Sequence, residues 1–154
     1  MRIMHLSLPL IIATVSLCTA APVTITDSTL IEKRADLIEV TPFYSGEWMN
    51  LDEIERGVNQ WCANQNGQVV PWGKSTNAQI SGLTLHSGGP GILAAHYTND
   101  DVRSGWTINE GECNDWMMQI ASLSPRGRSD GTHTQGGHGK IGGYGSIWID
   151  PNAA

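Results

Sequence analysis

The hydrophobic and polar positions along the chain predict two amphipathic helices. In residues 50–62, apolar side chains recur every three or four positions, which places them on one face of a helix. The members of this face are Leu51, Ile54, Val58, Trp61 and Cys62. Asn50 is expected to cap the helix with its side chain and Glu53 to complete the capping pattern, while Gly67 is expected to allow the turn that ends it.

The second helix is predicted over residues 109–121, where the same spacing returns. Its apolar positions are Cys113, Trp116, Met117 and Ile120. Asn109 is expected to be the N-cap residue, with Glu112 three positions further on. Each predicted helix therefore carries one cysteine on its apolar side.

The segments between and after the helices are typical of β-strands. The extended segments are residues 68–72, 78–86, 91–98 and 146–150. In the last of them, Ile147 and Ile149 alternate with Trp148, whereas residues 124–145 are rich in Gly, Ser and charge and are interpreted as a flexible, solvated loop. The order of elements predicts an α+β fold, with an antiparallel sheet on one side and both helices on the other.

The N-terminus predicts secretion. Residues 6–17 form an apolar run behind Arg2, shorter than the ~20 residues that a membrane-spanning helix needs, and small residues follow it. Residues 1–20 are therefore interpreted as a signal peptide. No other segment is expected to span a membrane.

Lys33 and Arg34 form a dibasic site that a processing protease could cut in a secreted precursor. The alternative is an ordinary basic pair on a solvated face. With cleavage there, residues 21–34 are a pro-segment and residues 35–154 a single domain, expected to be a monomer.

The mature chain is expected to be acidic. The whole sequence has nine basic and fifteen acidic residues, and residues 1–34 hold three of the bases and two of the acids. Six bases and thirteen acids remain, which gives a net charge of −7. This charge disfavours nucleic acids and anionic membrane surfaces as partners.

Cysteine usage fits an oxidising compartment. Of three cysteines, Cys18 lies in the predicted signal peptide, which leaves Cys62 and Cys113. One intramolecular disulfide is the economical outcome, and two free thiols, which exported proteins rarely keep, are the alternative.

Several short motifs resemble a known family. They are "WCANQNGQ", "GILAAHYTN", "SGWTINEGECNDWMMQI" and "TQGG" ahead of the closing strand "YGSIWIDPN". In order and spacing, over roughly residues 50–150, they resemble the small secreted killer toxin of smut fungi and the wider killer-toxin-like family of fungal secreted proteins. The resemblance implies an α/β sandwich with a split βαβ arrangement and a disulfide, here Cys62–Cys113, that joins the two helices.

The sequence also departs from that family. The toxin is cysteine-rich, and its other disulfide positions are empty here. The toxin interferes with calcium uptake, and this activity is associated with a basic loop after its first helix. The corresponding residues 69–77 of this chain have a single basic residue, Lys74. The resemblance therefore implies the fold and a toxin-like or effector role, but not channel blockade.

Tryptophans are candidates for ligand contact. The chain has six, of which Trp61 and Trp116 belong to the predicted helical faces. The other four could pack in the core or present their rings to a ligand; they are Trp48, Trp72, Trp106 and Trp148. Trp72 and Trp106 are the better candidates for stacking on a sugar.

The loop at residues 124–145 adds charged and imidazole side chains. Arg126 and Arg128 could contact an anionic ligand or form an exposed, protease-sensitive tip. His133 is a further candidate contact with His138 nearby, but nothing completes a set of three or four metal ligands. We therefore expect no metal and no other cofactor.

The sequence lacks a recognisable catalytic signature. It has no Gly-x-Ser-x-Gly elbow. His86 and His96 flank a Gly/Pro turn and could face each other across a hairpin, while the helical carboxylates are interpreted as caps and surface charge. The chain is therefore expected not to be an enzyme.

These observations predict a secreted, non-enzymatic fungal effector or toxin-like protein that acts on a host or competing cell. Its expected partner is an unknown target at the cell surface. The alternative is an extracellular module that binds cell-wall glycans.

Overall fold

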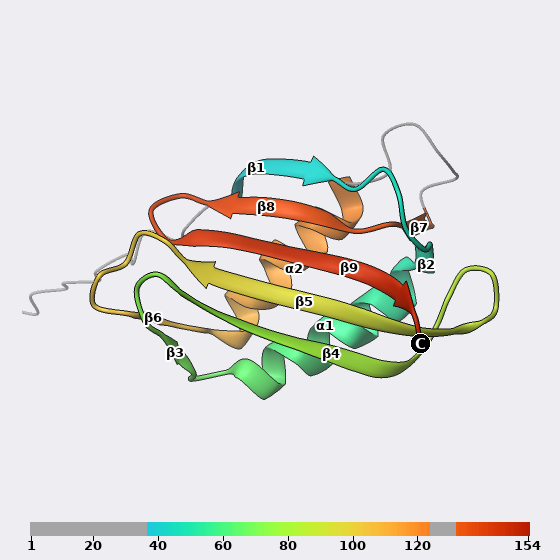
Figure 1. Cartoon of the computed structure of the whole chain (residues 1–154), viewed down its shortest axis with the longest axis horizontal. Coiled ribbons are helices and arrows are strands. Elements are labelled where there is room, and N and C mark those ends of the chain that lie inside the picture. Colours follow the sequence, from blue (N-terminus) through green and yellow to red (C-terminus); the bar gives the residue numbers. More distant parts are fainter. Residues whose placement is uncertain (1–36, 124–131) are drawn as a thin grey trace, which may run out of the picture. The chain divides into compact units, whose positions relative to one another are not determined.

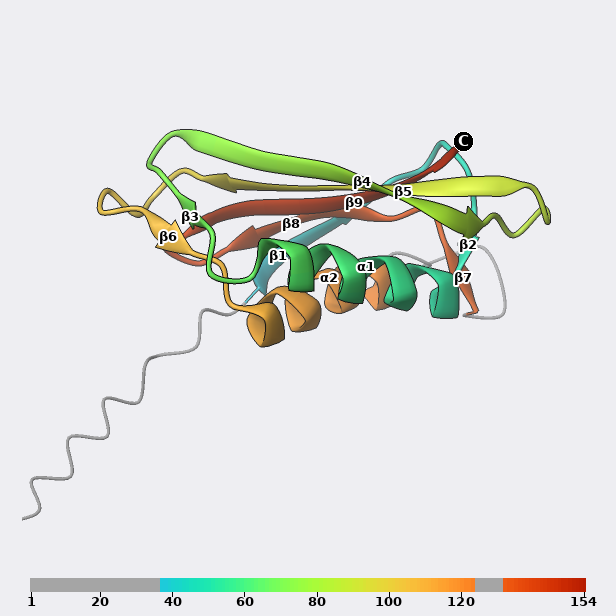
Figure 2. The same ribbon diagram turned by 90° about the horizontal axis from the view of Figure 1, so that it is seen from below.

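The fold is a five-stranded antiparallel sheet with α-helices packed on one of its faces, as Figures 1 and 2 show. The computed structural model describes residues 37–123 and 132–154. The predicted α+β class, with both helices on the same side of the sheet, is confirmed.

The sheet has the strand order β1-β8-β9-β5-β4, and all neighbours are antiparallel. In that order the strands are β1 (Leu37–Pro42), β8 (Gly137–Ile141), β9 (Gly145–Ala153), β5 (Pro90–Asn99) and β4 (Lys74–Thr84). The helices are α1 (Leu51–Gln65) and α2 (Glu110–Leu123). Two short ribbons complete the fold: β2 (Met49–Asn50) with β7 (His133–Thr134), and β3 (Val69–Val70) with β6 (Trp106–Thr107).

The connections contain the split βαβ arrangement that the resemblance implies. Because every neighbouring pair is antiparallel, β5 and β8 run parallel to each other with β9 between them, and the chain passes through α2 from one to the other. β1 and β4 are also parallel and lie at the two edges of the sheet, connected through α1.

The apolar face of α1 packs on the sheet as predicted. Ile54, Val58 and Trp61 are fully buried, while Leu51 is only half-buried. Gly57 lies on the same face, where an added Cβ would lie 2.8 Å from Leu93 Cδ2. Its missing side chain therefore lets the helix approach β5 closely.

The two helix starts differ. Asn50 is the N-cap residue of α1, as predicted, but its side chain makes no cap hydrogen bond and instead pairs with Nδ1 of His86 at 2.8 Å. The Glu53 carboxylate accepts the Thr84 backbone N–H at 2.7 Å, which ties the helix to β4. For α2, Oδ1 of Asn109 accepts the N–H of residue 112 at 3.1 Å, and its predicted cap is confirmed.

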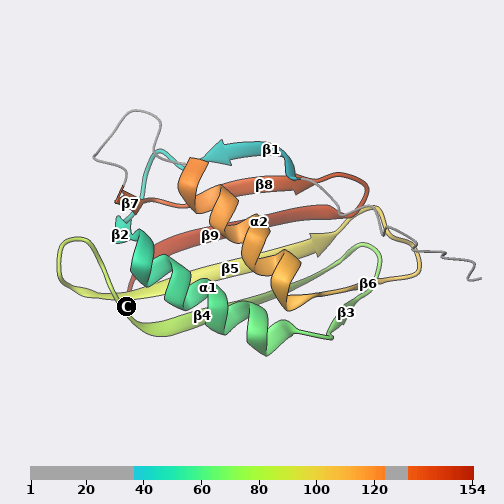
Figure 3. The same cartoon turned by 180° about the vertical axis from the view of Figure 1, so that it is seen from behind.

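A disulfide joins Cys62 of α1 to Cys113 of α2, with their Cα atoms 5.8 Å apart. Both cysteines are buried, and the helices that they connect lie side by side in Figure 3. The bond closes a loop with a sequence separation of 51 residues. Loop entropy then predicts a stabilisation of about 4 kcal/mol.

The interpretation of residues 124–145 as a solvated loop is wrong for the part that the structure describes. This part contains β7 and β8, and β8 lies inside the sheet between β1 and β9. Gly139 is buried, and a Cβ there would lie 2.7 Å from Leu37 Cδ1 and 3.0 Å from Ile120 Cδ1. Glycine here reflects the close packing of α2 on a strand.

The other strands differ from expectation mainly in length. β4 begins before the predicted segment and ends two residues before its end, β5 extends by one residue at each end, and the first predicted strand shortens to Val69–Val70. The strands β1, β2 and β6 were not predicted. In β9, Ile147 and Ile149 are buried while Trp148 points to the opposite face, as the alternation indicated. None of the helices in the described ranges is long and apolar enough to cross a membrane.

Candidate functional site

Trp72 is presented to solvent on the turn between β3 and β4. Its side chain is 54% exposed, although it is a large apolar group. The turn is closed by a hydrogen bond from the Lys74 N–H to the Pro71 carbonyl, 3.1 Å long. An indole in this position is available to a ligand.

The indole of Trp72 is held in place by the facing turn, which follows β5. Its Nε1–H donates to the Asp100 carbonyl at 2.9 Å. The Arg103 guanidinium carbon lies 5.4 Å from the ring centroid, within the range of a cation–π contact. The ring is therefore fixed at its nitrogen and contacted by a cation.

Buried Asn99 joins the two turns. Its Nδ2 donates to the carbonyls of Val70 at 2.8 Å and Val102 at 2.9 Å, and its Oδ1 accepts the Val102 N–H at 2.9 Å. The Gly73 N–H donates to the Asn99 carbonyl at 2.7 Å. The backbone on both sides of Trp72 is therefore already ordered in the folded protein, so binding of a ligand carries a smaller entropic cost.

The two turns also carry charged residues of both signs. We define the Trp72 surface as Trp72, Lys74, Asp100, Asp101 and Arg103. The Lys74 ammonium and both aspartate carboxylates belong to exposed residues. Within residues 37–123 and 132–154 these three groups make neither a side-chain hydrogen bond nor an ion pair, so they can still bind polar groups of a ligand.

A row of polar and aromatic side chains crosses the face of the sheet that the helices leave uncovered, which is the face toward the viewer in Figure 1. The strand registers place in one line Thr41, His138, Trp148, His96 and Asn77. At its centre the rings of His96 and Trp148 stack 5.1 Å apart, with 7° between their planes.

This row is connected to the strand that follows the Trp72 turn. His96 Nε2 lies 2.6 Å from Thr98 Oγ1, which lies 3.1 Å from Ser75 Oγ. Burial lowers the pKa of His96, and the nearby Asp100 carboxylate partly offsets that effect. Imidazole and hydroxyl groups therefore connect Trp148 to Ser75, the residue after Lys74 in β4.

His133 lies at the other end of the sheet, in the β2–β7 ribbon (Figure 1). Its ring stacks on His86 with 4.1 Å between centroids, and Trp48 meets it edge-on at 4.7 Å. The expectation that His86 and His96 face each other is wrong, because His96 is paired with Asn77 on the uncovered face. In the described ranges no three His, Cys, Asp or Glu residues are grouped so that they could hold a metal ion.

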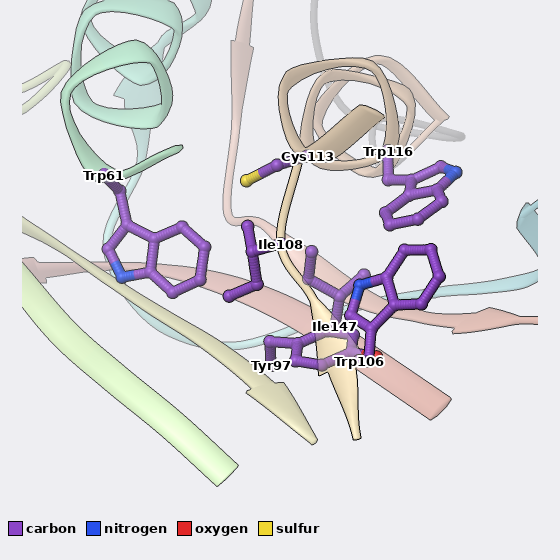
Figure 4. Close-up of a pocket in the computed structure, with 7 residues that line it drawn as sticks. All are labelled: Trp61, Tyr97, Trp106, Ile108, Cys113, Trp116 and Ile147. Carbon is purple, nitrogen blue, oxygen red and sulfur yellow. The ribbon is translucent and has the colours of Figure 1, made fainter. Parts of the chain in front are cut away.

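An aromatic cavity lies between the helices and the sheet (Figure 4). Its volume is about 10 Å³, which is the space of roughly one water molecule. Its wall consists of Trp61, Tyr97, Trp106, Ile108, Cys113, Trp116 and Ile147. The Tyr97 hydroxyl is buried without a hydrogen-bond partner in the described part of the chain, and burial together with the negative charges of Asp100 and Asp101 raises its pKa.

Trp106 is a wall residue of this cavity rather than an exposed platform. Its ring meets Tyr144 at 4.1 Å and lies 6.1 Å from Trp116. Of the two tryptophans favoured for sugar stacking, Trp72 is exposed and Trp106 is half-buried.

The structure thus places Trp72 and Lys74 in one turn and His133 at the other end of the sheet. Trp106 pairs with Val70 beside this turn, but it belongs to the wall of the cavity. Arg126 and Arg128 lie outside the described residues, as do Lys33 and Arg34 of the predicted processing site. Sequence reasoning missed Arg103 as a partner of Trp72. The only signal was that a second polar, Gly-containing turn follows a strand.

In comparisons with known proteins, no family model matches this sequence, and no curated protein sequence matches it either.

Proposed function

We propose that this protein is a secreted, non-enzymatic fungal effector or toxin-like protein that binds a target on a host or competing cell. The observation that carries the proposal is the buried Cys62–Cys113 bond between two helices on one face of an antiparallel sheet. Small exported domains use such bonds to supplement a limited core. The killer-toxin-like resemblance implies the same bond at the same two residues.

The Trp72 surface supports action by binding. Tryptophan and arginine are the residues that most often dominate the free energy of binding at interfaces. Here Trp72 and Arg103 are in contact on a backbone already ordered by Asn99. A surface with this preorganisation suits recognition of a target without a chemical step.

The test is a cell assay with the product secreted by a host that expresses the full chain. Intact-mass analysis of the product should give a chain that begins at Ala35 and contains one disulfide. Fungal and plant cells are exposed to it, and growth, viability and calcium entry are measured. The expected result is impaired growth or viability of at least one cell type, reduced by the Trp72→Ala substitution but not by Val69→Ala, which alters an equally exposed side chain.

A folded, oxidised product that affects none of these cells would contradict the proposal. Circular dichroism and the intact mass establish that each sample is folded and oxidised.

A further inference from the structure

The Trp72 surface has the chemistry of a carbohydrate site. We propose that it binds a neutral polysaccharide of a cell wall or cell surface, with one pyranose ring stacked on the indole of Trp72. This inference names a ligand for the proposed function. It depends on that function only for the location, outside the cell, where the protein meets the polysaccharide.

The indole of Trp72 is presented so that its face, not its N–H group, is available to a ligand. Its one donor, Nε1–H, is already used by the Asp100 carbonyl, so the ring offers a ligand its apolar face. Arg103 contacts the ring, and Trp72 is 54% exposed, so part of the indole surface remains accessible for stacking. A sugar ring fits an indole face because its own faces carry C–H groups, whereas its hydroxyl groups lie around the rim.

The two turns also supply polar groups that suit a sugar. Sugar hydroxyl groups both donate and accept hydrogen bonds. The carboxylates of Asp100 and Asp101 can accept them, and the Lys74 ammonium can donate. Hydrogen bonds to charged groups are the stronger kind, so a few of them can orient a sugar.

The balance of charge favours a neutral ligand. The Trp72 surface has two carboxylates, one ammonium and one guanidinium group. It therefore offers no excess of positive charge to a phosphate or a uronic acid. The mature chain also has a net charge of −7 if it begins at Ala35, which disfavours polyanions further.

Polar side chains on the uncovered face of the sheet begin at Ser75, the residue after Lys74. Ser75 and Thr98 are opposite each other, and the next outward row contains His96 and the indole of Trp148. These rows are two residues apart, about 7 Å, and β4 and β9 are separated by two strand spacings, about 10 Å. A ligand that reached from Trp72 to these rows would be longer than one sugar ring, so we expect an oligosaccharide segment with Trp148 as a second contact.

The experiment measures binding of the secreted, oxidised protein to insoluble chitin, cellulose and β-1,3-glucan, and to soluble oligosaccharides of two and five units by calorimetry. The native protein is expected to bind at least one of them. Trp72→Ala should weaken that binding about tenfold or more, as for a central aromatic contact. Val69→Ala is the matched control and should change it about twofold or less.

Two more variants test the arrangement of the site. Asp101→Asn keeps the shape of the side chain but not its charge, and it should weaken binding severalfold. Trp148→Ala should weaken binding of the five-unit oligosaccharide more than binding of the two-unit one. Should Trp72→Ala fail to fold by circular dichroism, Trp72→Phe, which retains a ring, and Asp101→Asn still test the site.

The proposal is overturned if the native protein binds no neutral polysaccharide, or if Trp72→Ala and Val69→Ala bind alike. An effect on cells without any polysaccharide binding would overturn this inference but not the proposed function. If Trp72→Ala then reduced the effect on cells, the target of the Trp72 surface would be a protein. Polysaccharide binding that depends on Trp72, without any effect on cells, would support the inference and contradict the proposed function.

Discussion

Gly57 sets the distance between α1 and the sheet. A Cβ at this position would lie 2.8 Å from Leu93 Cδ2 and 3.0 Å from Leu83 Cδ1, and both leucines are buried. Alanine favours a helix interior by about 1 kcal/mol over glycine, whereas overpacking a core costs about 1–3 kcal/mol. We therefore expect Gly57→Ala to lower the free energy of unfolding by up to about 2 kcal/mol in urea titrations.

The control for Gly57 is Asn59→Ala, at an exposed position of the same helix. It should change the free energy of unfolding by about 0.5 kcal/mol or less. A Gly57→Ala variant more stable than the native protein would show that the leucines move aside easily.

The Tyr97 hydroxyl is a second position where one atom decides the outcome. It is buried with no hydrogen-bond partner in the described ranges, which is an unfavourable state for a polar group. Tyr97→Phe removes this group and keeps the ring, so we expect unchanged or higher stability, by up to about 1–2 kcal/mol. A loss of stability in urea titrations would mean that the hydroxyl is hydrogen-bonded in solution, for example to water in the adjoining cavity.

At the scale of elements, the disulfide is the strongest single tie between α1 and α2. Replacing both cysteines by alanine should lower the free energy of unfolding by about 4 kcal/mol. Since domains are typically stable by about 5–15 kcal/mol, the variant should remain folded only marginally. Guanidinium titrations of the native and Cys62→Ala/Cys113→Ala proteins measure the difference, and a loss below about 1 kcal/mol would contradict the loop-entropy argument.

The Asn99 side chain links two elements of the fold, because its hydrogen bonds join the turn after β5 to the end of β3. Asn99→Ala leaves the Val70 and Val102 carbonyls without their donor, and we expect a loss of about 2–3 kcal/mol. Asn77→Ala, on the exposed edge strand β4, is the control and should be nearly neutral. If the two turns position Trp72, then Asn99→Ala should also weaken polysaccharide binding in samples that remain folded.

Periodicity was sufficient to predict α1, α2 and β9, because in each the buried side chains are large and regularly spaced. It failed for β8, where the inward positions include Gly137 and Gly139. The gap between α2 and β8 is too narrow for a larger side chain at Gly139, so this strand has the glycine-rich composition that is typical of a loop. A pattern of hydrophobic side chains cannot reveal a strand in which glycines occupy inward positions.

The candidate site was predictable only in part. Trp72, flanked by Pro71 and Gly73, is recognisable in the sequence as an aromatic residue on a turn. Its contact with Arg103 is not, since the two turns are brought together by the buried side chain of Asn99 and the pairing of β4 with β5. Tertiary hydrogen bonds of this kind leave no periodic signal.

At the scale of the whole molecule, stability should depend on pH in two separate windows. Burial lowers the pKa of His96 below 6.5, so the unfolded chain takes up this proton first as the pH falls. The His96 contribution is therefore fully present above the unfolded pKa, declines below about pH 6.5 and levels off below the folded pKa. Glu53 behaves as a stabilised carboxylate: its hydrogen bond with Arg56 lowers its pKa from 4.5, so its contribution is present above that pH and is lost as the pH falls through the folded pKa.

The two windows can be separated by urea titrations between pH 3 and 8. His96→Asn should flatten the decline in the free energy of unfolding that begins below about pH 6.5 and leave the Glu53 window unchanged. Glu53→Gln, which retains an acceptor for the Thr84 N–H, should reduce the slope only below about pH 4.5. Burial against Trp148 disfavours the charged imidazolium form of His96, so the native protein should lose stability on acidification from pH 7 to 6. The opposite result, a gain in stability that disappears in His96→Asn, would show that the folded protein favours the charged ring.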